Sequence, residues 1–168
     1  MKLKEAKEKF IQTWGALGSN WGINRSMAQV HALLLVSPNP LSTEDVMTEL
    51  NISRGNANMN LRDLIDWDLV SKVIKSGERK EFFEAEKDMW KVAMHIVKAR
   101  KKRELDPVLK VMLELNRVEG DKNSDEYKAF SQTIKGITQF SNKADSALET
   151  FLKADENWFL STFMKMLK

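Results

Sequence analysis

The chain has 168 residues, of which 42% are apolar and 30% charged, a balance typical of a globular protein with one domain or two small ones. Seven Gly and three Pro are few for this length, so the composition favours helices over tight turns. The formal net charge of +3 permits a polyanionic partner without requiring one. Cysteine is absent, which excludes disulfides, thiol catalysis and Cys-based metal centres.

The N-terminus is positively charged but has no apolar segment of the kind found in signal peptides. The longest purely apolar run, from Ala32 to Val36, is too short to span a bilayer. We therefore expect a cytoplasmic protein with no membrane partner. No glycine-rich phosphate loop, nucleophile elbow or paired-carboxylate motif is present, and His31 and His95 have no partner at metal-ligand spacing. These absences predict no enzyme activity, no metal and no cofactor, and His31 is expected to be a core residue.

The first two predicted helices are separated by a glycine-containing turn. Apolar residues at helical spacing predict a helix over residues 3–17, which Gly18 would end in a left-handed conformation. A capping-box pattern of Ser26 and Gln29 then precedes a second helix that is apolar almost all round. Such a helix usually lies in the middle of a domain.

Two capped helices follow in close succession after Pro40. Ser42 is a good N-cap for a short helix, and Ser53 caps another that runs to about Asp66. A short helix, a turn and a capped second helix form a helix-turn-helix pattern. The inward stripe of the second helix consists of Ala57, Leu61, Leu64 and Ile65.

The hydrophobic period then changes from helix to strand. Apolar runs starting at Leu69 and at Phe82 flank a loop, Ser76 to Arg79, and predict a β-hairpin. A helix-turn-helix followed directly by a hairpin is a winged helix. The predicted fold is therefore mainly α with a small hairpin wing, flanked by N- and C-terminal dimerisation helices.

From Asp88 onward the pattern is helical again. Pro107 suits the first position of a new helix, Ser124 caps a long final segment, and Asp155 starts a short last helix. These segments are too apolar for the winged helix alone to cover, which predicts a two-fold dimer. The large apolar residues that need a partner surface are Phe130, Ile134, Ile137, Phe140, Phe151, Phe159 and Phe163.

The basic stretch from Lys98 to Arg103 has two interpretations. It has the composition of a nucleic-acid patch, but on a helix its charges spread around the axis. We favour a solvated face or an ion-paired dimer edge.

The residues around the predicted recognition helix and wing resemble a known family. The stretches ISRGNANMNLR and GERKEFFEAEKD, within a match over roughly residues 10 to 107, are similar to the GbsR branch of the MarR superfamily. Its members are dimeric winged-helix transcriptional regulators of bacteria and archaea. Two positions depart from the family pattern. Asp68 stands where Gly is expected after the recognition helix, and Gly77 stands where an Asp often braces the wing arginine, here Arg79.

The helix after Ser53 is the predicted DNA reader. Its outer face carries Gly55, Asn56, Met59 and Arg62, with two further Asn beside them. Asn can read adenine, Arg can read guanine, and a Gly at a helix N-terminus lets a phosphate backbone approach. The alternative is a solvated polar face, which three poor helix formers at alternate positions disfavour. The wing cations could also contact DNA, and their alternative role is to keep a charged hairpin loop soluble. The predicted DNA contacts of helix and wing together are Ser53, Arg54, Gly55, Asn56, Asn58, Met59, Asn60, Arg62, Lys75, Arg79 and Lys80.

An effector site is suggested by the resemblance. Effectors of this superfamily usually bind between the winged helix and the dimer helices, and the GbsR branch is linked to choline and glycine betaine. Trp14, Trp21 and Trp90 lie in the segments that would join those parts, and aromatic faces can hold a quaternary amine. Packing residues in the core or dimer interface are the favoured alternative for these tryptophans.

We thus predict three regions: residues 1–21 as a helix joining the dimerisation region, 22–87 as the winged helix and 88–168 as the dimerisation helices. The predicted function is a dimeric regulator of transcription, a repressor responsive to a small effector, which binds a pseudo-palindromic operator in double-stranded DNA. The alternatives are a winged-helix module for protein interaction and a DNA architectural protein without an effector.

Overall fold

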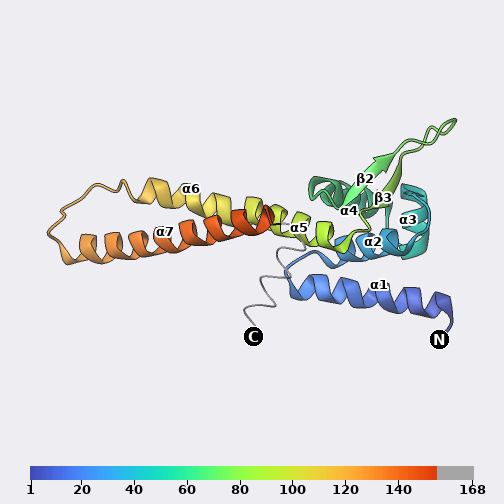
Figure 1. The fold of residues 1–168 in the computed structure, drawn as a ribbon, viewed down its shortest axis with the longest axis horizontal. Coiled ribbons are helices and arrows are strands. Elements are labelled where there is room, and N and C mark those ends of the chain that lie inside the picture. The colour runs from blue at the N-terminus through green and yellow to red at the C-terminus, as the bar shows by residue number, and fades with distance from the viewer. Residues whose placement is uncertain (155–168) are drawn as a thin grey trace. The chain divides into compact units, whose positions relative to one another are not determined.

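The computed structural model describes residues 1–154 and shows a mainly helical protein with a small three-stranded antiparallel sheet (Figure 1). The chain forms two compact units, Met1–His95 and a second that begins at Ile96. The predicted helix from Asp155, with Phe159 and Phe163, lies outside the described residues.

The first unit has the element order of a winged helix, so the predicted winged helix with its small hairpin wing is confirmed. The sheet order is β1-β3-β2, with Leu41 opposite Phe83 and Val70 opposite Ala85. The β2–β3 hairpin is the wing. The elements are α1 (Leu3–Asn20), α2 (Arg25–Val36), β1 (Leu41–Ser42), α3 (Thr43–Leu50), α4 (Arg54–Asp66), β2 (Val70–Val73) and β3 (Phe82–Ala85), followed by α5 (Met89–Arg100), which crosses into the second unit.

The core of the first unit surrounds α2, as its apolar sequence predicts. α1, α3, α4 and β3 all pack against this helix, and Val30 and Leu34 are among its fully buried side chains. The predicted inward stripe of α4 is confirmed at Ala57, Leu61 and Leu64, which are buried. The Lys87 ammonium, two residues after β3, donates to the carbonyls of Leu34, Leu35 and Ser37 at the end of α2.

Local caps explain where most helices begin. The side chains of Ser42, Ser53 and Ser124 each accept a backbone N–H of the first helical turn, as predicted. Ser42 forms a capping box with Asp45. Asp68 adopts φ 58° in the turn after α4, so aspartate takes the left-handed conformation expected of glycine there.

The end of α1 and the start of α2 differ from the prediction. Gly18 does not end α1; it lies inside the helix, where an added Cβ would come within 2.6 Å of the Ala28 Cβ. Close packing of α1 on α2 therefore explains this glycine, and Gly22, at φ 76°, makes the left-handed turn. The predicted Ser26 capping box is wrong, because Asn24 caps α2 by accepting the Met27 N–H at 3.2 Å.

The second unit is a pair of helices, α6 and α7, that lie side by side (Figure 1). Pro107 lies in the first turn of α6, as predicted, and the chain reaches this helix from α5 through one π-helical segment, η1 (Lys101–Leu105). Lys101 in that segment pairs with Asp106, Asp145 and Glu149 at 3.0, 2.9 and 3.3 Å. The elements of this unit after α5 are η1 (Lys101–Leu105), α6 (Asp106–Leu115) and α7 (Asp125–Leu152).

Two residues of the basic stretch form ion pairs within the chain, and the ion-paired dimer edge stays a prediction. Besides Lys101, whose pKa is raised by its carboxylate partners, Arg100 pairs with Glu104 at 3.0 Å. Both side chains are thus engaged within their own unit. No helix among residues 1–154 has the length and apolarity needed to cross a membrane.

Candidate nucleic-acid interface

One ridge of α4 faces solvent along the whole helix. It consists of Gly55, Met59, Arg62 and Asp66, spaced three or four residues apart and all exposed. A Cβ added at Gly55 would meet no atom within 4 Å, so the helix surface is open there. Met59 is 52% exposed, a large share for an apolar side chain. Asp66, which we did not predict, is also exposed and adds a negative charge at the far end of the ridge.

The start of α4 is held by two contacts. The Ser53 hydroxyl accepts the Asn56 N–H at 3.2 Å. The Arg54 guanidinium lies 2.8 Å from a Glu44 carboxylate oxygen, which ties α4 to α3. The pKa of Glu44 is lowered by its own backbone N–H, by Arg54 and by the more distant charge of Lys80. The Arg54–Glu44 pair therefore fixes the first turn of α4 against α3.

The three asparagines of α4 do not share one surface. Asn56 and Asn58 are half-buried on opposite flanks of the ridge, and the Asn58 side-chain oxygen lies 3.3 Å from the Thr43 hydroxyl. Asn60 is fully buried, so its predicted position beside the outer face is wrong. The reason is the helical period: Asn60 stands three residues after Ala57 and one before Leu61, within the buried stripe. Asn60 is therefore unable to contact DNA directly.

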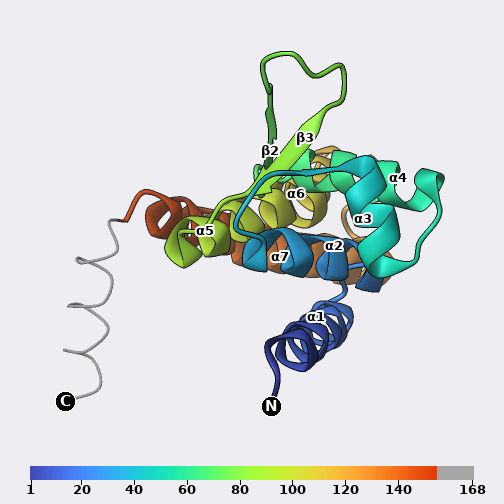
Figure 2. The same ribbon diagram turned by 90° about the vertical axis from the view of Figure 1, so that its right-hand side faces the viewer.

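The wing loop is longer than the four residues expected. It runs over residues 74–81 and projects beyond the helices of its unit (Figure 2). Gly77, at φ 81°, makes its turn, and the Glu78 N–H donates to the Lys75 carbonyl at 3.1 Å. Arg79 and Lys80 are exposed, as a contact with DNA requires.

Lys75 differs from the other two wing cations. Its ammonium lies 3.8 Å from the centre of the Phe82 ring and 3.4 Å from the Pro40 carbonyl. The side chain therefore folds back onto the base of the wing, where a cation over an aromatic face is stabilised. Arg79 and Lys80 remain as exposed cations of the wing loop. Ile74, the first residue of that loop, is 94% exposed and was not predicted as a site residue. No sign of this exposure is visible in the sequence, because Ile74 ends an apolar run that predicts a strand.

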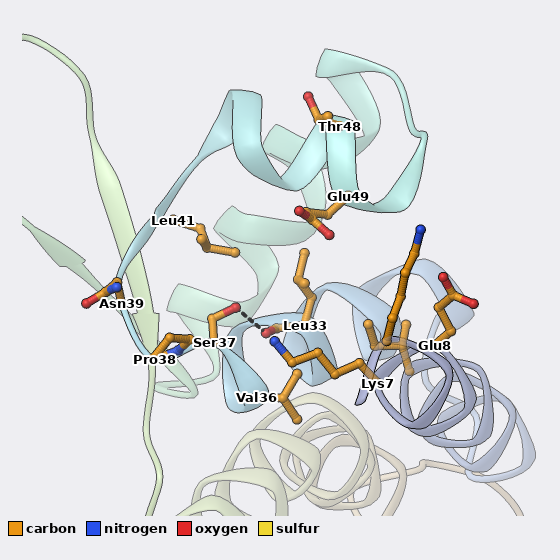
Figure 3. A pocket seen from close by; sticks show the side chains of 12 residues that line it. Lys7, Glu8, Leu33, Val36, Ser37, Pro38, Asn39, Leu41, Thr48 and Glu49 are labelled. Atoms are coloured by element: carbon orange, nitrogen blue, oxygen red, sulfur yellow. Dashed lines mark hydrogen bonds between the residues drawn. The ribbon is translucent and has the colours of Figure 1, made fainter. Parts of the chain in front are cut away.

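A hollow of about 570 Å³ lies between α1, α2 and α3 (Figure 3). Its lining includes apolar side chains such as Leu33, Val36 and Leu41, and charged side chains such as Lys7 and Glu49. The three tryptophans proposed for an effector do not line this hollow. Trp21 is exposed, Trp90 is half-buried, and Trp14 packs against Phe10 and His31 with ring centres 5.5 and 6.2 Å apart.

His31 is buried beside Trp14, as predicted for a core histidine. Burial lowers its pKa to about 4, because the imidazolium would lose its hydration. Its Nε2 has no hydrogen-bond partner among residues 1–154. The same residues contain no cluster of three side chains able to hold a metal ion.

Comparison with solved structures identifies the fold. A protein described as a transcriptional regulator superimposes with a TM-score of 0.62 at 18% identity, over 89% of this chain and 99% of that one. A mutant of the S. aureus protein MepR bound to an oligodeoxyribonucleotide gives 0.41 at 10% identity, over 79% and 91%. The adhesin competence repressor AdcR of Streptococcus pyogenes gives 0.37 at 18% identity, over 86% and 98%. No protein-family model and no curated protein matches the chain.

Proposed function

We propose that this protein is a DNA-binding transcriptional regulator, with α4 in the major groove and the wing loop at the adjacent minor groove. The observation that carries the proposal is the exposed ridge of α4 beside exposed wing cations on one winged-helix unit. Arg62 supplies positive charge on α4 and Arg79 supplies it on the wing loop, and both side chains are exposed.

The remaining predicted contacts follow from these positions. The first turn of α4, from Ser53 to Gly55, faces the phosphate backbone, because N–H groups at a helix start attract anions. Met59 suits contact with a thymine methyl group, and Arg79 suits a narrow minor groove. We leave Asn60 and Lys75 out of this set, since the first is buried and the second is folded onto Phe82.

We further propose that the protein acts as a homodimer on a pseudo-palindromic site. Two recognition helices must enter successive major grooves, which lie about 34 Å apart. The exposed apolar side chains of α6 and α7, among them Leu113 and Phe140, supply a surface for a second copy. The GbsR-like branch and a repressor role, relieved by a small effector, belong to the same proposal and rest on the resemblance of the sequence.

A protein-docking role for the winged helix is the competing function. It would require a contiguous apolar patch on the surface that we assign to DNA. Met59 and Ile74 are exposed there, but charged and polar residues of α4 and the wing separate them in the sequence. Isolated apolar side chains among cations suit a groove of DNA better than a protein partner.

The central experiment is selection of bound sequences from random DNA duplexes. We expect a pseudo-palindromic preference, which Asn56→Ala flattens. Arg79→Ala should weaken binding to all sequences by about tenfold and make binding less dependent on salt, because one cation is lost from the minor-groove contact. Lys128→Ala, on α7, is the matched control for lost charge. A wild-type protein with no preference among duplexes at physiological salt would refute the assignment.

The effector proposal is tested separately. We expect choline or glycine betaine to change tryptophan fluorescence and operator binding if Trp14, Trp21 and Trp90 help to hold a quaternary amine. Each aromatic face contributes about 0.5–2 kcal/mol, so millimolar ligand is the relevant range. No change in either signal at that concentration removes quaternary amines as effectors and leaves the DNA assignment in place.

A further inference from the structure

The C-terminal end of α2 lacks the backbone donors that usually close a helix. The last carbonyls of a helix have no partner within it, and a left-handed residue just beyond normally brings N–H groups to them. Here the cap residue Ser37 is extended, at φ −79° and ψ 131°, and Pro38, which follows it, has no N–H. The Ser37 hydroxyl donates to the Leu33 carbonyl at 2.8 Å (Figure 3). The carbonyls after Leu33 are thus open to a donor from elsewhere in the chain.

Lys87 is that donor. Its ammonium lies 3.0 Å from the carbonyl oxygen of Leu34, 2.7 Å from that of Leu35 and 2.8 Å from that of Ser37. An ammonium has three protons, so three carbonyl acceptors use its whole donor capacity. Its positive charge also lies at the negative end of the α2 dipole. Lys87 therefore closes α2, although 50 residues or more separate it from these acceptors in the sequence.

The residues on either side of Lys87 join the sheet to α5. Before it, the Glu86 N–H donates to the Leu69 carbonyl at 3.0 Å, beside the end of the wing strands. After it, the Asp88 carboxylate accepts two N–H groups from the first turn of α5, at 2.9 and 3.2 Å, and so caps that helix. Lys87 is the single residue between these two attachments, so its contact with α2 fixes the point from which α5 starts.

Packing adds little to this attachment. The part of α5 up to His95 belongs to the first unit, and of the described residues of α5 only Val92 is buried. A helix face with many buried side chains has its direction fixed by close packing, whereas a single buried side chain constrains that direction much less. Polar contacts at the start of α5 therefore contribute more to its placement on the winged helix.

We propose that Lys87 is a positioning residue that fixes the direction in which α5 leaves the winged helix, and thereby the separation of the two recognition helices in a dimer. The inference rests on the proposed function. α5 continues into the second unit, where we place the dimer contacts. Freedom at the start of α5 would let the two copies of α4 take several separations. Successive major grooves lie about 34 Å apart, so a dimer with one separation accepts one half-site spacing.

The test removes the three donors of Lys87. Lys87→Met keeps most of the apolar stem of the side chain and loses the ammonium. In selection from random duplexes, we expect the wild type to choose half-sites at a single spacing. Lys87→Met should choose the same half-site sequence at several spacings. Its affinity for the wild-type operator should fall by about tenfold, because a smaller share of the dimers has the matching separation. A single, unchanged spacing in Lys87→Met would overturn the inference.

Two variants separate this role from lost charge and from lost stability. Lys91→Met removes the same charge from α5, where Lys91 lies 3.8 Å from Glu86 in a partly exposed ion pair. Asn24→Ala removes the cap at the other end of α2 and so destabilises the same helix. Both should keep the single spacing of the wild type. If either variant also broadens the spacing, charge or stability explains the effect and the inference fails.

A second measurement needs no DNA. The chain has no cysteine, so Asp66→Cys, at the exposed end of the α4 ridge, gives one attachment site for a spin label in each copy. The distances between the two labels of a dimer report the separation of the recognition helices. We expect Lys87→Met to widen this distribution about twofold, because several directions of α5 become populated. An unchanged width would overturn the inference. If the width changes as expected but the wild type selects no sequence, the proposed function fails while the positioning role of Lys87 stands.

Discussion

The winged-helix unit buries its apolar side chains, whereas the α6–α7 pair leaves many of its own in solvent. In α2, most residues from Met27 to Leu34 are buried. In α6 none is buried, and in α7 only Ile134 and Ser141 are. The first unit therefore closes its own core, whereas the second leaves large apolar side chains exposed among residues 1–154.

The physical reason lies in how many neighbours each helix has. α2 is surrounded by three helices and a strand, so it can be apolar on all sides. Two helices side by side cover only one stripe of each other, and helical bundles normally need four helices to enclose a core. Leu113 and Phe140, 62% and 74% exposed, are on the sides left uncovered among the described residues. A second copy of the chain would complete such a bundle, as the proposed dimer requires.

The largest expected effect is a loss of stability that differs between the two units. Leu34→Ala should lower the free energy of unfolding by about 2–5 kcal/mol, because it opens a cavity in a closed core. Leu113→Ala makes the same chemical change at an exposed position of α6, so it should lower the free energy of unfolding of the monomer only slightly. Denaturant titrations at several protein concentrations give both values. Equal losses at high dilution would show that the contrast between the units is wrong.

The next effect concerns association. Phe140→Asp places a charge on the exposed apolar side of α7 and should raise the dimer dissociation constant by about 100-fold. Gln139→Asp, which adds the same charge at a neighbouring polar position, is the control. Sedimentation over a range of concentrations measures both. A wild-type chain that sediments as a monomer at micromolar concentration would contradict the proposed dimer.

Acid should weaken the closed core of the first unit through His31. Its pKa is about 4 when folded and near 6.5 when unfolded, so the unfolded state binds the proton first. The contribution of neutral His31 to the free energy of unfolding is fully present above about pH 6.5. It decreases as the pH falls, and the free energy of unfolding is lower by about 3 kcal/mol near pH 4. Between pH 6.5 and 5, the lowered carboxylate pKa values of Glu44, Asp45 and Glu86 contribute little, so His31→Leu should flatten this window. An equally steep decline in His31→Leu would assign the acid sensitivity to other groups.

The smallest effect concerns the ion pairs of the second unit. Lys101 joins η1 to α7 through Asp145 and Glu149, and such partly exposed pairs are weakened by salt. Replacing Lys101 with Met should lower the stability of this unit by about 1 kcal/mol at low salt and by less at 1 M salt. Lys110→Met, on α6, is the control. A loss that does not depend on salt would show that Lys101 acts by packing.

Much of the fold was predictable because it depends on local interactions. A serine that caps a helix acts within four residues, so Ser42, Ser53 and Ser124 were identified from the sequence. The site was predictable where exposure follows from the helical period, as for Gly55, Met59 and Arg62. The period also placed Asn60 inside, but its polar character suggested the opposite. Burial of an amide depends on having a hydrogen-bond partner, and here that partner is one turn away.

The sequence by itself determined the order of elements, the capped helix starts and the inward stripe of α4, since these depend on residues close in the chain. Only the tertiary structure decided that Gly18 packs against Ala28, that Lys75 folds over Phe82 and that the buried Asn60 amide donates to Asn56. Each of these depends on the distance and direction between groups. Composition and spacing state which groups are available, whereas packing selects which of them meet and which stay exposed.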